Sequence, residues 1–505
     1  MKKKSSLLFL SRIIKLLVGI VSLSFSAKYY GVSLEKDTWL LAISIVIFLD
    51  LAIWGAINET FRSKFIFMRE ELGEVEALNK TKSLIFFIFL FSILISIAVF
   101  VFPGFLGKII APKYDDNQLN GLIQMILIAT PILLINQITA IGTSILNANE
   151  SFFVPEIAGF GSAIINLLLL ILLAPVIGIY ALILSYYIGS LLLFALIYRQ
   201  IYKIKINIFT GYKNVKFSDF KIFFIFALPF FFPYFLGQIT GVIEKTLVSS
   251  IGVGYVSILD YSRKFSDIIQ GVLTSVIVTI LVPILSTNYI KKKEDDFLFD
   301  FLQIYQLGLL FLTFIIALFT SSSASVVDIF LDRGTIPQAA LLEISDLMIL
   351  YIWSTLAVFN YIIFGLVLMS IGSVKKYAFW GIVAQLMSIL IIFVFIKKIG
   401  VYIFPISLFV SHLFSGAVMF TEFPYKSKLF YKIVFKYLGV VFFTSIILFS
   451  LNKIFFNFSN PFLTIIINSF VILFVLLSLI VLFKLEEIKH IKGFLKKAIQ
   501  LCRGF

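Results

Sequence analysis

Two pairs of cationic residues stand inside apolar segments of this chain. Arg12 and Lys15 lie in the first such segment, and Arg263 and Lys264 lie in the eighth. A cation in the hydrocarbon core of a membrane costs at least about 2.5–3.5 kcal/mol, so such residues usually face a polar cavity. A guanidinium binds phosphate oxygens bidentately and an ammonium adds a point charge. We therefore predict a central cavity in which these four residues bind a pyrophosphate.

Each pair also has a simpler interpretation. Arg12 and Lys15 are three residues apart, share one helix face, and are near enough to the chain start to extend toward the membrane surface. Arg263 and Lys264 have Asp260 and Asp267 at helical neighbour spacing, so ion pairs within one helix are the alternative. Both interpretations stay open at this point.

Three carboxylates occupy predicted helices, at Asp50, Glu156 and Glu244. A carboxylate within a membrane helix acts as a counter-ion, couples transport to a cation, or pairs structurally. His412 is an isolated histidine within an apolar helix, a setting more typical of a hydrogen bond between helices than of a proton shuttle.

Four helix-breaking residues fall in the predicted seventh helix, and proline removes a backbone hydrogen bond while glycine lowers the cost of bending. We predict a hinge here, with a kink of no functional consequence as the alternative. These residues are Pro229, Pro233, Gly237 and Gly241.

The composition predicts the elements that position these groups. The 505 residues are 60% hydrophobic and only 14% charged, whereas soluble domains have about a quarter charged residues. The apolar runs are about 20 residues long, which is the length that crosses a bilayer as a helix. A membrane β-barrel would show alternation instead. We predict an all-α polytopic membrane protein with fourteen helices, at residues 6–27, 38–58, 83–103, 121–146, 152–173, 176–200, 222–250, 253–287, 299–321, 340–371, 377–396, 400–420, 432–451 and 461–484.

The charge of the chain indicates orientation rather than a nucleic-acid partner. The net charge is +15, but the lysines and arginines gather in alternate loops, as expected when charge sets topology. This pattern predicts that both termini are cytoplasmic. The Lys2–Lys4 run precedes a first helix that we expect to be retained, because it lacks a small-residue cleavage site. Cys502 is the single cysteine, which excludes an intramolecular disulfide and a cysteine-based metal site.

An internal repeat indicates two lobes. The sequence Ile-Gly-Ile-Tyr around Gly178 and the sequence Ile-Gly-Val-Tyr around Gly400 lie 222 positions apart, and each should form a tight turn between two helices. We predict an N-lobe of six helices at 1–215, a pseudo-symmetric C-lobe of six helices at 222–430, and two further helices with a basic tail at 431–505.

The sequence also resembles the MviN/MurJ family of the multidrug/oligosaccharidyl-lipid/polysaccharide flippase superfamily. The resemblance rests mainly on Leu228-Pro229, on the run from Ile258 to Phe265, on Gln270-Gly271-Val272 and on the run from Ile280 to Ser286. In the first half it includes Ser11-Arg12, Tyr30-Gly31, Asp37, Gly55-Ala56, and Ile145-Leu146-Asn147 followed by Pro155. Residues 1–290 carry most of it.

The resemblance implies a transporter, not an enzyme, in the bacterial cytoplasmic membrane. Its cargo would be an undecaprenyl-pyrophosphate-linked saccharide, moved from the inner to the outer leaflet by alternating access. No cofactor is implied, although Na⁺, H⁺ or the membrane potential could drive the cycle. Membrane lipids and polysaccharide assembly proteins would be its partners, and we expect a monomer.

Arg12 and Lys264 match family arginines, and Glu244 is the counterpart of an acid at the family's cation site. Departures from the family pattern bear on the cargo. A second arginine of helix one falls at Val18, a basic pair at the end of helix two falls at Leu49 and Asp50, and an acid of helix eleven has no counterpart near Gln385 and Ser388.

These missing charges favour flipping of O-antigen or capsule repeat units, and the peptidoglycan precursor lipid II is the alternative cargo. A drug or cation antiporter and a membrane polysaccharide polymerase are less favoured. The former would have twelve helices and an acid-lined N-lobe, and the latter a large catalytic loop.

Overall fold

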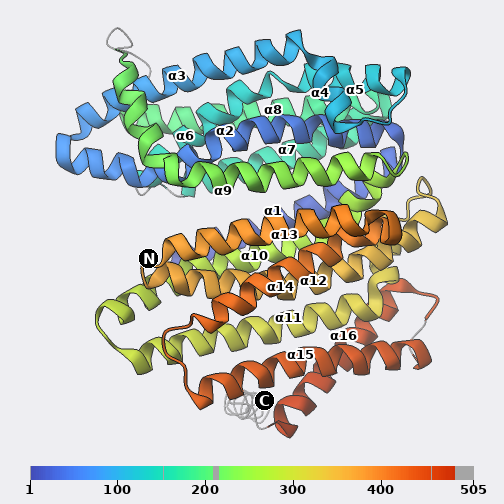
Figure 1. The fold of residues 1–505 in the computed structure, drawn as a ribbon. Helices are drawn as coiled ribbons and strands as arrows, with labels where there is room; N and C mark the ends of the chain where they lie inside the picture. Colours follow the sequence, from blue (N-terminus) through green and yellow to red (C-terminus); the bar gives the residue numbers. More distant parts are fainter. Residues whose placement is uncertain are drawn as a thin grey trace, which may run out of the picture. The chain divides into compact units, whose positions relative to one another are not determined.

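The structure is a computed structural model that describes residues 2–149, 151, 153–206, 208, 215–455 and 458–483. Within these ranges only the backbone is described at residues 2–13, which include Arg12, and at 275, 276, 278–280, 429 and 452–455. The described part of the chain is helical, and its helices are labelled in Figure 1. They are α1 (Lys2–Tyr30), α2 (Leu34–Leu72), α3 (Glu74–Val101), α4 (Pro103–Ile110), α5 (Asp116–Ala129), α6 (Ile132–Ala148), α7 (Phe153–Ile177), α8 (Tyr180–Lys203), α9 (Phe217–Ser249), α10 (Tyr255–Ile290), α11 (Glu294–Phe330), α12 (Gln338–Ser370), α13 (Val374–Ile399), α14 (Ile403–Thr421), α15 (Lys428–Phe455) and α16 (Pro461–Leu482).

The predicted membrane helices are confirmed. Eleven helical stretches of the described chain are long and apolar enough to span a membrane, and one of them, Val374–Thr421, contains both α13 and α14. Helices α1 and α10, with 29 and 36 residues, also exceed the length that a bilayer requires. Taken together these elements account for all fourteen predicted segments.

Helix boundaries differ most from prediction between residues 59 and 82. The high density of charge there predicts a loop, yet α2 continues to Leu72 and α3 begins at Glu74, with Gly73 alone between them. Gly73 has φ +85°, a conformation that favours glycine, so one residue reverses the chain. Charged residues are compatible with helix, and the extension therefore emerges beyond the apolar span as an amphiphilic helical hairpin.

The fourth predicted helix is interrupted. Its 121–146 segment consists of the end of α5 and nearly all of α6, which meet at Thr130 and Pro131. Proline lacks the amide hydrogen that would continue α5, but it is well accommodated where a new helix starts. The short helix α4, which precedes α5, was not predicted.

The repeated corners form the tight turns that the sequence indicates. Gly178 has φ +58° between α7 and α8, and Gly400 has φ +65° after α13. Both are left-handed conformations that side chains with a Cβ rarely adopt. The glycine of each corner is therefore required by backbone geometry.

The chain forms two compact units. The first comprises Met1–Tyr261, Phe330–Ala340 and Gly381–Ser407, and the second comprises Ser262–Ile329, Leu341–Trp380 and Leu408–Phe505. Helices α10, α13 and α14 each contribute residues to both units. The two-lobe division at residues 215 and 430 stays a prediction.

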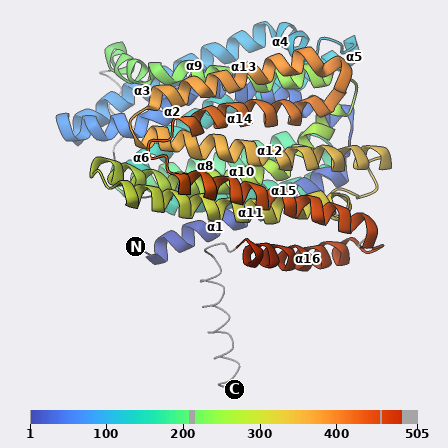
Figure 2. The same cartoon turned by 60° about the horizontal axis from the view of Figure 1, so that its bottom comes forward.

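The first unit has its core where α2, α3 and α9 run side by side, an arrangement visible in both Figure 1 and Figure 2. Phe61 and Phe65 of α2 stack on one another, and Phe61 also stacks on Phe223 of α9 at 5.5 Å between ring centroids. Phe87 and Phe91 of α3 extend this aromatic layer. Aromatic side chains therefore pack α9 against both α2 and α3.

The second unit has an aromatic core of its own. Phe301 and Tyr305 of α11 stack, and Phe423 stacks on Phe430 with 4.3 Å between centroids. The Tyr305 hydroxyl donates to Asn360 of α12 at 2.8 Å. Helix α16 is joined to α11 by a hydrogen bond from Asn468 to the hydroxyl of Ser322, the residue at which α11 departs from helical geometry.

Candidate functional site

The cations of helix α1 begin the candidate site. Arg12 lies on α1, but its side chain is outside the described residues. Lys15 is exposed, and its ammonium lies beside Gly159 of α7, where a methyl group in place of the glycine hydrogen would be 3.3 Å from Nζ. The small residue on α7 therefore leaves room for a cation at this helix pair.

Arg263 of α10 is held from two directions inside the second unit. Its Nε donates to Oδ1 of Asp267 at 3.2 Å, one helical turn later, and its guanidinium lies 5.9 Å from the ring centre of Tyr351. The side chain is 38% exposed. The predicted pairing with Asp267 is confirmed. It does not exclude an anion, because one guanidinium carries five N–H donors.

Lys264, the next residue, is exposed. Consecutive helical residues point about 100° apart, so the ammonium of Lys264 and the guanidinium of Arg263 cover adjacent sectors of α10. These two successive residues supply a planar fork and a point charge, the two kinds of cationic group that bind phosphate. Each unit thus presents cationic side chains on a membrane-spanning helix.

A buried polar network surrounds Asp50 within the first unit. Asp50 is 7% exposed, and its carboxylate accepts hydrogen bonds from the side-chain amides of Gln137 and Asn136 of α6. Gln137 in turn accepts from Asn58 at 3.0 Å, and Asn136 donates to the Tyr186 hydroxyl of α8 at 3.1 Å. Amide donors compensate the carboxylate here, and no cationic side chain pairs with it among the described residues.

Asp37 is a second buried carboxylate, and the sequence analysis names it only as part of the family resemblance, without a chemical role. It lies in the first turn of α2 and accepts from the backbone amides of Gly254 and Ser257 at 2.5 and 2.7 Å, and from the Ser257 hydroxyl at 2.6 Å. These groups form the amino-terminal end of α10. Burial and the charge of Asp37 raise the pKa of the neighbouring Tyr114 phenol, which stays neutral.

Further contacts bring the same region of the first unit together. Tyr261 of α10 donates to the Gly31 carbonyl at 3.0 Å, Arg333 donates to Ser24 at 3.1 Å, and Thr335 donates to the Ala27 carbonyl at 2.5 Å. The end of α1, the start of α2, the start of α10 and the segment before α12 are therefore joined by hydrogen bonds.

Comparison with known proteins identifies the family. The family model of the lipid II flippase MurJ matches residues 26–469, which include every element from the end of α1 to the middle of α16. The chain belongs to the MurJ family. Members of this family are lipid flippases, which are transporters and not enzymes.

Solved structures show the same fold. A lipid II flippase MurJ in an inward closed conformation is 21% identical, with a TM-score of 0.80 over 94% of this chain and 98% of that one. An inward-facing multidrug resistance MATE transporter is 12% identical, with a TM-score of 0.62 over 86% of this chain and 98% of that one. A MOP superfamily transporter from Pyrococcus furiosus is 13% identical, with a TM-score of 0.59 over 83% and 94%. No curated protein sequence matches the chain.

The other carboxylates of this MurJ-family chain lie near helix ends or among partners. Glu156 is half-buried in the first turn of α7, one turn before the Gly159 position that faces Lys15. Glu244 is half-buried in α9, where its neighbour Lys245 donates to the Leu40 carbonyl at 3.2 Å. Their roles in ion coupling or as counter-ions stay predictions.

His412 lies in α14 and is 7% exposed. Its Nδ1 is 3.0 Å from the Leu408 carbonyl oxygen and 3.2 Å from the Ser411 hydroxyl, and its ring packs edge-on against Tyr361 at 5.1 Å. The hydrogen bonds of His412 among the described residues therefore stay within α14, unlike the bond between helices that the sequence predicts, and only its ring contacts another helix.

The predicted hinge residues all lie inside α9, which continues from Phe217 to Ser249 through Pro229 and Pro233. A Cβ at Gly237 or Gly241 would meet no atom within 4 Å. These glycines are therefore not required for close packing, which leaves local flexibility as the property that they add to the helix.

Proposed function

We propose that this protein moves lipid II, the polyprenyl-pyrophosphate-linked precursor of peptidoglycan, from the inner to the outer leaflet of a bacterial cytoplasmic membrane. The observation that carries the proposal is the match of the MurJ family model over residues 26–469, nearly the whole chain. The comparisons therefore support the alternative cargo of the sequence analysis, and they give no specific support to O-antigen or capsule units.

The cationic side chains supply the chemistry for this cargo. Arg12 and Lys15 of α1, together with Arg263 and Lys264 of α10, would bind the pyrophosphate, which is the part of the lipid-linked substrate that carries fixed negative charge. Binding would be electrostatic and bidentate, without covalent chemistry. The sugar and peptide would then be selected by neutral groups.

Alternating access is the transport mechanism that we infer. Helix α9, with its two prolines and two glycines that no neighbouring atom crowds, would bend. The hydrogen bonds that the start of α10 donates to Asp37 would have to break and re-form if that end of the protein opens. Na⁺, H⁺ or the membrane potential would drive the cycle. Both termini would be cytoplasmic, and the protein would act as a monomer that can receive substrate from assembly proteins.

One observation keeps a second cargo in view. Asp50 and Leu49 occupy the place where the family resemblance puts a basic pair, and Asp50 is embedded among amides. A site with fewer cations would suit a lipid-linked O-antigen or capsule unit, which carries the same pyrophosphate on a different saccharide.

Complementation distinguishes the two cargoes. The gene would be expressed in one strain depleted of its lipid II flippase and in another that lacks its O-antigen flippase. We expect restored viability in the first strain and no surface polysaccharide in the second. Rescue of the second strain alone would overturn the lipid II assignment, and the Arg263→Gln/Lys264→Gln variant serves as the matched negative control in both.

A further inference from the structure

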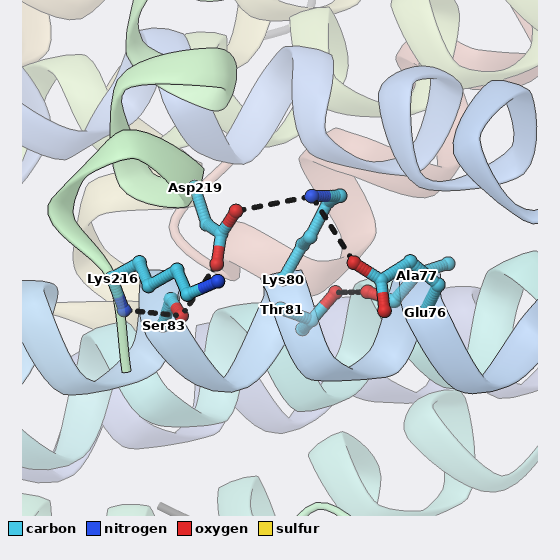
Figure 3. A network of polar contacts seen from close by, with 7 residues as sticks. All are labelled: Glu76, Ala77, Lys80, Thr81, Ser83, Lys216 and Asp219. Carbon is cyan, nitrogen blue, oxygen red and sulfur yellow. Dashed lines mark hydrogen bonds and ion pairs between the residues drawn. The ribbon is translucent and has the colours of Figure 1, made fainter. Parts of the chain in front are cut away.

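The seam between α3 and α9 in the first unit begins with a polar pocket of about 370 Å³. Its walls come from residues 76–83 of α3 and residues 215–219 at the start of α9. Lys80 forms ion pairs with Glu76 at 3.3 Å and with Asp219 at 3.1 Å, as Figure 3 shows. Ser83 donates to Asp219 at 3.1 Å and accepts from the Lys216 amide at 3.2 Å. The two carboxylates of the pocket are therefore already engaged.

Two lysines of the same pocket remain without a carboxylate partner among the described residues. Lys82 is only 8% exposed, and its ammonium has a single hydrogen bond, a long one of 3.4 Å to the Asn79 side-chain oxygen. Lys216 extends toward Ser83 and Asp219 in Figure 3 and is otherwise exposed. An anion in the pocket would give these two ammonium groups a charged partner that the described side chains do not supply.

An apolar groove of about 550 Å³ follows along the same helices. It is lined by residues 91–98 of α3, residues 217–224 of α9, and Ile53 and Trp54 of α2. Among the described residues that line the groove, Lys221 alone is charged. Phe87, which lies between the two cavities on α3, packs on Phe217 and Phe220. From the first residues of both helices onward, the walls of these cavities thus change from polar to apolar.

The groove extends over much of one leaflet. From Phe91 to Ala98, which line it on α3, the helix rises by about 10 Å at 1.5 Å per residue, and half of a hydrocarbon core of about 30 Å is about 15 Å. The polar pocket would then lie at headgroup level, at the end of the chain's first unit that the charge pattern assigns to the cytoplasm. Anionic headgroups are attracted to basic clusters at this surface.

We propose that this seam is a binding site for an anionic glycerophospholipid. Lys82 and Lys216 bind the headgroup phosphate. One acyl chain lies in the groove between Trp54, Leu94 and Phe224, and Lys221 adds a positive charge from the groove wall. The site is separate from the cations of α1 and α10, and the inference does not depend on which cargo the protein transports.

Trp54 provides a direct probe of the groove. The protein would be reconstituted with Trp54 as its only tryptophan, and its fluorescence would be quenched by phosphatidylglycerol or phosphatidylcholine with brominated acyl chains in a phosphatidylcholine background. We expect phosphatidylglycerol to quench at several-fold lower mole fraction than phosphatidylcholine. The substitutions required are Trp39→Phe, Trp353→Phe and Trp380→Phe.

Substitutions distinguish the contribution of the lipid headgroup to binding from that of the acyl chain. Lys82→Ala and Lys216→Ala should each weaken phosphatidylglycerol binding about fivefold, the value expected for one lysine at an anionic surface. Ala98→Phe should reduce quenching by both lipids, because the new ring fills the groove. Lys108→Ala, which removes an exposed lysine on α4, is the matched control and should change neither.

Three results would overturn the proposal. Equal quenching by the two lipids would make the groove an ordinary lipid-facing surface. Unchanged selectivity in a folded Lys216→Ala variant would remove the headgroup assignment, and this exposed residue tests it even if Lys82→Ala does not fold. Displacement of the brominated lipid by stoichiometric undecaprenyl pyrophosphate would assign the seam to a transport substrate instead.

Discussion

The carboxylate of Asp37 accepts hydrogen bonds from both the backbone amide and the hydroxyl of Ser257, at 2.7 and 2.6 Å, across 220 positions of sequence. Its other oxygen accepts from the Gly254 amide at 2.5 Å. The first turn of a helix has unpaired amides and a partial positive charge, and here a carboxylate from another helix satisfies both. The start of α2 is thereby fixed to the start of α10.

Asp37→Ala should strongly destabilise the protein, because it leaves buried amides of α10 without acceptors. Each buried group that loses a charged partner costs about 1–3 kcal/mol. We expect a clear fall in the melting temperature of the purified protein. The unfolding would be measured in detergent by tryptophan fluorescence.

Asp115→Ala is the control for this measurement. Asp115 also caps a helix, α5, through Gln118, but it is exposed, so water can replace the lost hydrogen bond. Equal shifts in the two variants would show that the Asp37 contacts add no stability beyond an ordinary cap.

Arg263→Gln/Lys264→Gln should abolish transport while membrane insertion stays normal. Glutamine keeps hydrogen-bonding capacity but removes both charges from α10, and a pyrophosphate would lose its electrostatic partners there. The measurement is flipping of a fluorescent lipid II in proteoliposomes, with protein level checked by gel filtration. Lys293→Gln, in an exposed ion pair with Asp296, should transport normally. Full activity in the double variant would exclude the predicted role of these residues.

Asp50→Asn tests whether the buried carboxylate couples transport to an ion. The amide has nearly the same shape and can still accept the hydrogen bond from Gln137, and it loses only the long contact of 3.5 Å from Asn136, so the melting temperature should fall only modestly. If Asp50 binds the coupling ion, the variant's transport rate should no longer depend on the Na⁺ or pH gradient across the proteoliposome. A retained gradient dependence would assign Asp50 to structural hydrogen bonding alone.

Gly237→Ala/Gly241→Ala should slow transport without weakening the fold. A Cβ at either position meets no atom within 4 Å, and alanine favours helix over glycine by about 1 kcal/mol, so α9 becomes stiffer without a clash. Transport rate and melting temperature would be measured together. An unchanged transport rate would contradict the hinge.

Gly55→Ala is the contrasting substitution for the hinge variant. A Cβ on Gly55 would lie 2.6 Å from the Tyr234 ring of α9, so a loss of stability is expected there before any change in transport. Comparing the two variants distinguishes an effect of helix stiffness on the transport rate from an effect of a steric clash on stability.

The membrane helices could be predicted because the property that defines them is local. An apolar run of about 20 residues must satisfy its backbone as a helix in lipid, whatever surrounds it. The corners at Gly178 and Gly400 were predictable for the same reason, since a left-handed turn selects glycine at one position. The charged hairpin around Gly73 was not predicted, because charge density alone does not distinguish a loop from a solvated helix.

The side-chain partners were decided by the tertiary structure. The sequence alone placed Arg12, Lys15, Arg263, Lys264 and Asp50 within membrane helices, since a charge in an apolar run is conspicuous. It could not pair Asp50 with Gln137, Asp37 with Ser257, or Lys82 with Lys216 in one pocket, because those relationships join residues 87, 220 and 134 positions apart along the chain. Each depends on how whole helices pack, and helix packing is set by the sum of many weak side-chain contacts that no local pattern encodes.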